Sequence, residues 1–270
     1  MLMQPPRDEI RKVWDERAQA HKEDSRASMP DRFLIDLEIR KLCRRIPHGD
    51  AILDIGCANG YTDLKIASRR KVTITGFDNS AAMISEALKA LAIAPLSQEV
   101  KGRIVFETGD LLSPEIVKKY QPQKFDKAVT KRVLINIPTW EGQQQAIENI
   151  YHILPQGKVY IMMESTLQGY EKISRMRERF GIERTKVRWH NKYLDEDRLV
   201  PFLKGMFDIE QAVNFSSTYY AGSRVIQPLL LKPFGKEPSY DFILNRLFAR
   251  LPSLGDCGIQ KMFVLRKKRM

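Results

Sequence analysis

An acidic residue followed by two spaced glycines is the feature of this sequence with the clearest chemical meaning. Residues 52–61 read ILDIGCANGY, so Asp54 lies at the end of an apolar run and Gly56 and Gly60 follow it. Glycines let the backbone turn sharply and let a ligand approach closely. The helix expected after Gly60 would offer unpaired N–H groups at its start. The pattern therefore predicts a ligand-binding turn between a strand and a helix.

Two further acidic residues close apolar runs later in the chain: Asp78, followed by Asn79, and Asp110, followed by Leu111. A carboxylate at a strand end can accept hydrogen bonds from both ribose hydroxyls, and another can accept from an adenine amino group. Asp54 would repel a pyrophosphate but could hold an ammonium group, and the GxGxxG pattern of dinucleotide sites is missing. Together the three acids favour a cationic amino-acid ligand over a nicotinamide dinucleotide, although each acid alone could be a helix cap.

The apolar segments that would position these acids alternate between patterns typical of strands and patterns typical of helices. Short runs typical of strands are expected at 51–55, 72–77, 103–107, 125–130 and 158–163. Helical patterns lie between them, at 60–69, 80–92, 113–120 and 141–153. Strands separated by helices indicate βαβ units, a parallel sheet covered on both faces and right-handed crossovers. The sequence therefore predicts an α/β fold with a doubly wound sheet.

Further elements flank this alternation. Two helices are expected at 7–23 and 31–46, before the first strand, and two more at 195–204 and 241–250, with strands at 207–215 and 262–265. Two stretches interrupt the later elements: 165–192 is amphipathic and strongly basic, and 216–258 is rich in Tyr, Pro and Gly. Long insertions in a compact domain are usually functional, so we expect both to be helical or irregular caps over the ligand crevice.

The motifs, in this order and spacing, resemble those of class I S-adenosylmethionine-dependent methyltransferases of the small-molecule type. The residues that match the cofactor-binding motifs of the family are Asp54, Gly56, Gly60, Asp78 and Asp110. The resemblance covers residues 10–163, and 193–215 loosely, and Ala58 stands where the family often has glycine. It implies a seven-stranded Rossmann-like sheet whose last strand is antiparallel, and S-adenosyl-L-methionine as the cofactor.

The resemblance also implies roles for the regions of the chain. Residues 1–48 would cover the cofactor, the core would comprise 49–164 and 193–215 with 259–270, and 165–192 and 216–258 would be substrate caps. The candidate cofactor-binding residues are Asp54, Gly56, Cys57, Ala58, Gly60, Asp78, Asn79, Asp110, Leu111, Lys131 and Trp14. Trp14 could equally serve only to pack its helix.

Candidates for catalysis lie nearer the caps. Methyl transfer needs mainly alignment and, for some acceptors, a base, so sequence identifies catalytic residues poorly. His190 is the candidate base because histidine titrates near neutral pH, although it could equally be a packed or solvated side chain. Glu164, at the end of the fifth strand, could pair with His190 or accept from the substrate. Arg224, Tyr193 and Tyr219 are candidate substrate-binding residues, since an arginine suits a carboxylate or phosphate; the tyrosines could instead be core aromatics.

Charge narrows the class of substrate. The chain has 270 residues and a formal charge of +12, from 45 basic and 33 acidic residues. Residues 165–192 contain eight basic and three acidic residues, and 261–270 contain five basic residues and no acidic one, so the rest of the chain is nearly neutral. A nucleic-acid binder would more often show a basic stripe across the whole domain. The basic cap therefore indicates an anionic small substrate.

These observations predict an enzyme that methylates a hydroxyl or amine of a small metabolite, with an acidic one favoured. The fourth strand ends in TKRV at 130–133, which lacks the Asn/Asp-Pro-Pro-aromatic motif of nucleic-acid amino methyltransferases and argues against a nucleic-acid partner. An RNA- or protein-modifying methyltransferase and a non-catalytic S-adenosylmethionine-binding protein are the alternatives. The sequence predicts no oligomeric state.

Composition also excludes some classes of site and location. Three widely spaced cysteines without a CxxC motif argue against a disulfide framework or a cysteine zinc site, and no His, Asp or Glu cluster has metal-ligand spacing. We therefore expect no metal. The segment MLMQPPRDEIRKVW lacks the apolar core of a signal peptide, and no run of roughly 18 apolar residues is present. The expectation is a cytoplasmic protein without a membrane span.

Overall fold

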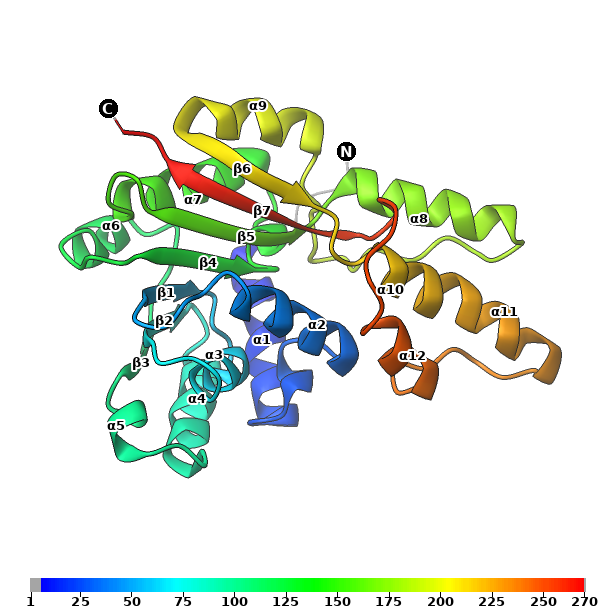
Figure 1. The fold of residues 1–270 in the computed structure, drawn as a ribbon, viewed down its shortest axis with the longest axis horizontal. Coiled ribbons are helices and arrows are strands. Elements are labelled where there is room, and N and C mark those ends of the chain that lie inside the picture. The colour runs from blue at the N-terminus through cyan, green and yellow to red at the C-terminus, as the bar shows by residue number, and fades with distance from the viewer. Residues whose placement is uncertain (1–5, 270) are drawn as a thin grey trace.

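A seven-stranded sheet forms the centre of the computed structural model, which describes residues 6–269 (Figure 1). Its order is β3-β2-β1-β4-β5-β7-β6; strands β1 to β5 pair in parallel, and β7 is antiparallel to both of its neighbours. The strands are β1 (Ala51–Ile55), β2 (Thr73–Asp78), β3 (Ile104–Thr108), β4 (Lys127–Lys131), β5 (Val159–Ser165), β6 (Phe207–Val213) and β7 (Gln260–Lys267). The strand order reverses between β1 and β4, where sheets of this kind bind ligands.

Helices cover both faces of the sheet (Figure 1). They are α1 (Arg7–His21), α2 (Arg32–Cys43), α3 (Tyr61–Ala67), α4 (Ala81–Ile93), α5 (Gln98–Lys101), α6 (Glu115–Tyr120), α7 (Trp140–Ile153), α8 (Leu167–Arg179), α9 (Glu196–Met206), α10 (Ser217–Ala221), α11 (Gln227–Leu231) and α12 (Ile243–Phe248). Short helical turns are η1 (Ser25–Ala27), η2 (Leu134–Asn136), η3 (Gly222–Ile226) and η4 (Lys232–Phe234). Among residues 6–269, no helix is both long and apolar enough to span a bilayer.

Two hydrophobic cores lie on opposite faces of the sheet. Because side chains alternate along a strand, the neighbouring Ile52 and Leu53 of β1 enter different cores. One core contains side chains from α2, α3 and α4, and the other contains side chains from α6, α7 and α9. Every residue of β5 is buried, as expected of a central strand covered on both sides. The predicted α/β fold, with a seven-stranded doubly wound sheet and an antiparallel last strand, is confirmed.

Side-chain caps fix where the helices near the site begin. Asp31 accepts from the backbone N–H of Leu34 at 3.2 Å at the start of α2, and Ser80 accepts from that of Met83 at 3.0 Å at the start of α4. Such bonds satisfy N–H groups that have no partner within the helix. The caps therefore place the helix starts beside the carboxyl ends of the strands.

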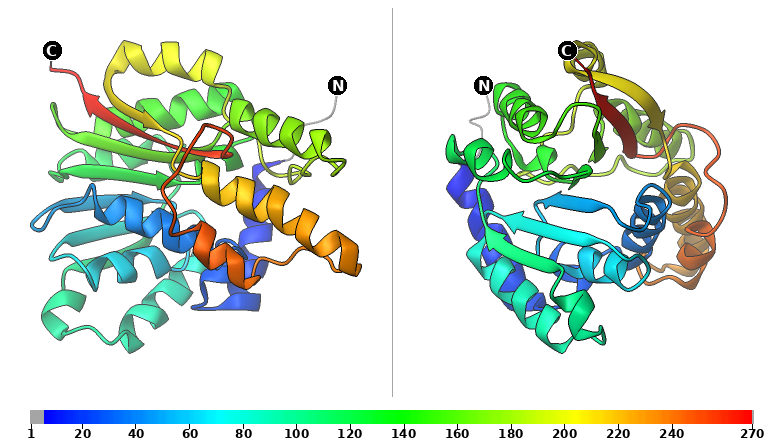
Figure 2. Two further views of the ribbon diagram at one scale, coloured as in Figure 1. Left: turned by 45° about the vertical axis from the view of Figure 1, so that its right-hand side comes forward. Right: turned by 60° about the vertical axis from the view of Figure 1, so that its left-hand side comes forward.

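The second insertion differs from the sequence reading. We expected one helix at 241–250, but a continuous helical segment also runs over 217–234 and packs against α8 (Figure 2). Pro228 has no N–H, so it cannot bond to the carbonyl of Arg224 four residues earlier. The guanidinium of Arg177, on α8, donates to that carbonyl instead. A long-range contact thus stabilises a helix that local composition argues against.

Candidate functional site

The turn after β1 has a constrained backbone. Gly56, Ala58 and Gly60 all have positive φ angles, of 72°, 50° and 70°. A Cβ at Gly56 would lie 2.5 Å from Val133, and one at Gly60 would lie 2.6 Å from Phe106. Both glycines are therefore required by conformation and by close packing. Ala58 adopts the left-handed conformation despite its Cβ, at a cost of roughly 1 kcal/mol.

Asp78, at the end of β2, holds this turn in place. One of its carboxylate oxygens accepts from the backbone N–H of Ala58 and the other from that of Ser80, both at 2.9 Å. Burial raises the pKa of Asp78, while these two hydrogen bonds favour the charged form and lower it in part. The expected ligand-binding acid therefore also supports the glycine turn.

A pocket of about 1080 Å³ opens at the carboxyl ends of β1, β2 and β4, and we call it the strand-end pocket. Ten of the eleven residues expected to bind the cofactor line it, namely Asp54, Gly56, Cys57, Ala58, Asp78, Asn79, Asp110, Leu111, Lys131 and Trp14. Gly60 does not line it and packs against Phe106 instead. The pocket lies where the strand order reverses, so the sheet brings together residues that are far apart in the sequence.

Buried carboxyl groups cluster at the part of this pocket nearest β1. Asp54 is buried beside Asp63, and burial raises the pKa of both side chains. The charge of Lys131, whose amino group donates to Thr62, lowers these pKa values only in part. Asp78 adds a third carboxyl, which raises the pKa of Asp54 further. A bound cation would therefore be stabilised in this region.

The first helix, α1, covers the outer side of the strand-end pocket. Its Arg7 donates to both carboxylate oxygens of Asp110, at 2.6 and 2.7 Å. Ser80 donates to Asp15 at 2.5 Å, and Trp14 lines the pocket. Asp110, expected on the adenine side, is thus paired with an arginine that the sequence reading did not single out.

A comparison with protein-family models decides the family. The model described as "Methyltransferase domain" matches residues 46–195, which is more than half of the chain. The chain belongs to this methyltransferase family. A comparison with curated proteins gives no match.

Solved structures agree with this assignment at the level of the fold. The methyltransferase aligns with magnesium protoporphyrin IX methyltransferase of Synechocystis PCC 6803 with bound SAH, at 14% identity and a TM-score of 0.58, over 97% of this chain and 98% of that chain. It aligns with a structure of the Haloferax volcanii complex between the Trm112 methyltransferase activator and a methyltransferase, at 13% identity and a TM-score of 0.56, over 95% and 98% of the two chains. An S-adenosylmethionine-dependent methyltransferase of Methanosarcina mazei gives 18% identity and a TM-score of 0.55, over 85% and 98%. The predicted class I S-adenosylmethionine-dependent family is confirmed.

A second pocket of the methyltransferase, of about 1380 Å³, adjoins the first. The side chains that line both pockets, and so form a shared wall, are Trp14, Ser28, Arg132 and Asn136. We call the second one the basic pocket, because its charged lining residues are Arg132, Arg177, Lys186, Arg188, Arg224 and a single acid, Asp31. Neither Lys186 nor Arg188 takes part in an ion pair within the described chain. Arg177 donates only to the backbone carbonyls of Glu183 and Arg224, so the basic stretch contributes three uncompensated charges to the wall.

His190, the candidate base, lines the basic pocket and is 5% exposed. It lies between Trp14 and Trp189, with ring centroids at 5.8 and 5.3 Å. Neither ring nitrogen has a hydrogen-bond partner among residues 6–269. Burial, with the nearby charges of Arg188 and Arg17, lowers the pKa of His190 to about 4. The imidazole is therefore neutral at pH 7 and is held in place by aromatic packing.

Glu164, the other candidate catalytic residue, lies apart from both pockets. It is fully buried and lines neither pocket. Its carboxylate accepts from the backbone N–H groups of Val133, Leu134 and Ile135, at 2.9, 3.1 and 3.4 Å. The expected pairing with His190 is not formed, because these N–H groups occupy both carboxylate oxygens. Burial raises the pKa of Glu164 to about 7 in spite of the three bonds.

Glu164 binds the short helix η2, and η2 binds the segment that contains His190. The side chain of Asn191 donates to Oδ1 of Asn136 at 2.9 Å, and the backbone N–H of Lys192 donates to the carbonyl of Ile135 at 2.7 Å. Hydrogen bonds therefore connect Glu164 to the segment of His190 through η2.

The three substrate-binding candidates separate in the structure. Arg224 and Tyr193 line the basic pocket, whereas Tyr219 is buried in the core and does not line it. Arg224 donates to Asp31 at 2.6 Å, and the hydroxyl of Tyr219 donates to the same carboxylate. Tyr219 thus takes the position of the alternative reading, a core aromatic whose hydroxyl bonds to a buried partner at the start of α2.

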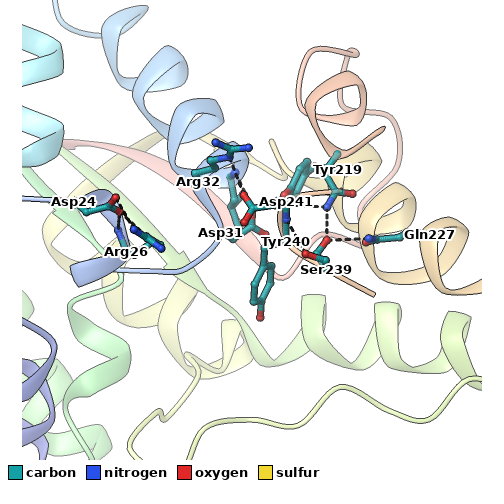
Figure 3. Close-up of polar contacts among 11 residues, drawn as sticks. Asp24, Arg26, Asp31, Arg32, Tyr219, Gln227, Ser239, Tyr240 and Asp241 are labelled. Carbon is teal, nitrogen blue, oxygen red and sulfur yellow. Dashed lines mark hydrogen bonds and ion pairs between the residues drawn. The ribbon is translucent and has the colours of Figure 1, made fainter. Parts of the chain in front are cut away.

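Polar contacts also fix the loop between η4 and α12 (Figure 3). Arg32, next to the cap of α2, pairs with Asp241 at 2.9 Å. The side chain of Gln227 donates to the carbonyl of Ser239 at 2.8 Å. Ser239 and Tyr240 line the basic pocket, so these contacts make the loop part of its wall.

Two buried polar residues that the sequence reading missed connect N-terminal elements to the site. Glu38, on α2, accepts from Arg132 and lies 3.8 Å from Lys131. The side chain of Asn59, within the glycine turn, donates to the carbonyl of Lys22 at 2.7 Å. An acid on the apolar face of a helix is a signal that could have identified Glu38.

No group of three or more His, Cys, Asp or Glu in the described part of the chain is arranged to hold a metal ion. All three cysteines are free thiols, and burial raises the pKa of Cys57 well above its ordinary value. Cys57 is therefore an uncharged wall residue of the strand-end pocket.

Proposed function

We propose that this methyltransferase transfers the methyl group of S-adenosylmethionine to a hydroxyl or amine of a small anionic metabolite. The wall shared by the strand-end pocket and the basic pocket is the observation that best supports the proposal. In the first pocket the carboxyl groups of Asp54 and Asp78 lie together at the ends of β1 and β2, with Asp63 beside Asp54, which suits the ammonium group of the cofactor. The second has an excess of guanidinium and ammonium groups, which suits an anionic acceptor.

The residues of the strand-end pocket fit S-adenosylmethionine. Asp54, buried beside Asp63, would hold the ammonium group, Asp78 would accept from the ribose hydroxyls, and Asp110 is the acid expected on the adenine side. When bound, the cofactor supplies a methyl group already activated by a positively charged sulfur. The protein then has to align the acceptor, exclude water and, where a proton must leave, provide a base.

We infer that His190 is that base. Its pKa of about 4 leaves the ring unprotonated at pH 7, and it lies against Trp14 in the shared wall. Replacing His190 with Asn should lower kcat by about a hundredfold or more, within the range for general bases, and leave cofactor affinity unchanged. The wild-type rate should fall through protonation of this group only below about pH 5. Steady-state kinetics against pH measure both effects, and an unchanged kcat would contradict the assignment.

Arg188 is predicted to help select an anionic acceptor. Radiolabelled methyl groups should pass to carboxylate- or phosphate-bearing acceptors in preference to their neutral esters, and Arg188→Glu should raise the acceptor KM by about tenfold. Arg175→Glu is the matched control, because Arg175 is also exposed in the basic stretch but does not line the pocket.

An equal KM for both variants would contradict the anionic acceptor. Transfer of the radiolabelled methyl group to RNA or protein would favour a macromolecular substrate. If that substrate is RNA, its binding should weaken steeply as the salt concentration rises. Retained cofactor binding without transfer to any acceptor would favour a non-catalytic binding protein.

A further inference from the structure

Exposed apolar side chains gather at the end of the molecule formed by α11 and α12. Of the sixteen large apolar residues that are exposed in the described chain, eight lie within 226–254. The two most exposed of these are Phe234, at 74%, and Leu254, at 75%. Figure 1 shows these helices at the opposite end of the molecule from α5 and β3. A concentration of exposed apolar side chains in one region of a protein often marks an interaction site.

The exposed residues follow helical spacing. Ile226, Leu230 and Phe234 stand four residues apart along 217–234, and Ile243, Leu247 and Leu251 repeat that spacing on and after α12. Residues four apart share one face of a helix. The opposite faces are occupied, since Gln227 and Asn245 are fully buried within the protein. Each segment therefore presents an apolar stripe to solvent, and we call the two stripes together the apolar surface.

Basic residues are interspersed with the apolar surface. Lys232 and Lys236 lie at the end of the first stripe, and Arg246 and Arg250 lie within the second. All four are exposed, and none takes part in an ion pair within residues 6–269. Of the two acids nearby, Asp241 is already paired with Arg32. A second copy of the same face would meet like charges, which disfavours a symmetric dimer here.

We infer that the apolar surface docks on the surface of an anionic lipid bilayer. Helices that lie in a bilayer interface combine an exposed apolar face with lysine and arginine, because apolar side chains enter the acyl boundary while cations contact anionic headgroups. Ser239 and Tyr240, from the loop between the stripes, line the basic pocket. Docking would therefore bring this part of the pocket wall close to the membrane. The inference stands apart from the proposed methyl transfer, because it rests on surface residues alone.

Vesicle co-sedimentation of the full chain tests this inference. The protein should bind vesicles that contain phosphatidylglycerol, bind phosphatidylcholine vesicles much more weakly, and dissociate as salt rises. Phe234→Ser should lower the partition coefficient by about tenfold or more, and the pair Arg246→Glu with Arg250→Glu should do the same. Ile93→Ser is the matched control, since Ile93 is 73% exposed at the end of α4, and should change nothing.

Three results would overturn the inference: no binding to phosphatidylglycerol vesicles, equal binding to both lipids, or binding that Phe234→Ser leaves unchanged. Sedimentation velocity tests whether the apolar surface instead binds a second copy of the protein. If the wild type formed a dimer that Phe234→Ser abolishes, and did not bind vesicles, the surface would be a dimer interface and the inference of membrane binding would be overturned. Because all the substituted residues are exposed, unfolding temperatures should match the wild type and verify that each variant is folded.

Discussion

Replacing Asp78 with alanine is expected to weaken S-adenosylmethionine binding by about a hundredfold or more. The change removes an acceptor for two ribose hydroxyls, and hydrogen bonds to a charged group contribute roughly 1.5–3 kcal/mol each. Every 1.4 kcal/mol or so is a factor of ten in affinity. The change also frees the N–H groups of Ala58 and Ser80, each held at 2.9 Å, so the glycine turn loses its support. Both effects act in the same direction.

Isothermal titration calorimetry with S-adenosylmethionine and S-adenosylhomocysteine measures this loss. Asp78→Asn keeps one acceptor oxygen and should bind with an affinity between the wild type and the alanine variant. Asp208→Ala removes an exposed acid from the edge strand β6 and should leave affinity unchanged. Thermal unfolding without ligand shows how far the substitution destabilises the glycine turn, and so separates that effect from the loss of contacts with the cofactor. An Asp78→Ala protein with wild-type affinity would show that the cofactor does not bind in the strand-end pocket.

The strand-end residues could be predicted from the sequence because the rule that brings them together is local. Each acid follows a short apolar run, and parallel strands of a doubly wound sheet end at the same edge. Asp54, Asp78 and Asp110 therefore had to meet once the alternation of strands and helices was recognised, and all three line one pocket. The glycines follow the same logic, since a positive φ at Gly56 is a property of the turn itself.

The structure of the insertion 216–258 could not be predicted in the same way, because residues far away in the sequence determine it. Pro228 argues against a helix locally, yet Arg177, from another element, donates to the carbonyl that Pro228 leaves free. Tyr219 looks like a pocket residue until Asp31, 188 positions earlier, is found to accept from its hydroxyl. Composition gives no information about such partners, so neither the helix nor the hydrogen bond could be foreseen.

The turn between β4 and α7 depends on one buried carboxyl, so Glu164→Ala is expected to destabilise the protein by about 3 kcal/mol or more. The substitution would leave the N–H groups of Val133, Leu134 and Ile135 without their acceptor, and each buried unpaired donor costs roughly 1–3 kcal/mol. Urea unfolding measures the loss. Glu141→Ala, which removes an exposed acid at the start of α7, is the control and should have little effect.

The pH dependence of stability then shows whether Glu164 acts as buried support or as a base. Burial raises the pKa of Glu164 to about 7, against an ordinary value of 4.5, so between these pH values the folded protein keeps a proton that the unfolded chain has released. Stability from this group is therefore fully present below about pH 4.5 and is lost as pH rises through about 7, by roughly 3 kcal/mol. Glu164→Gln keeps an acceptor oxygen but does not titrate, so its urea unfolding should vary less over that range and most of kcat should remain. If Glu164 were itself the base, the Gln variant would lose its activity, and a residue that only positions η2 and His190 would not show that loss.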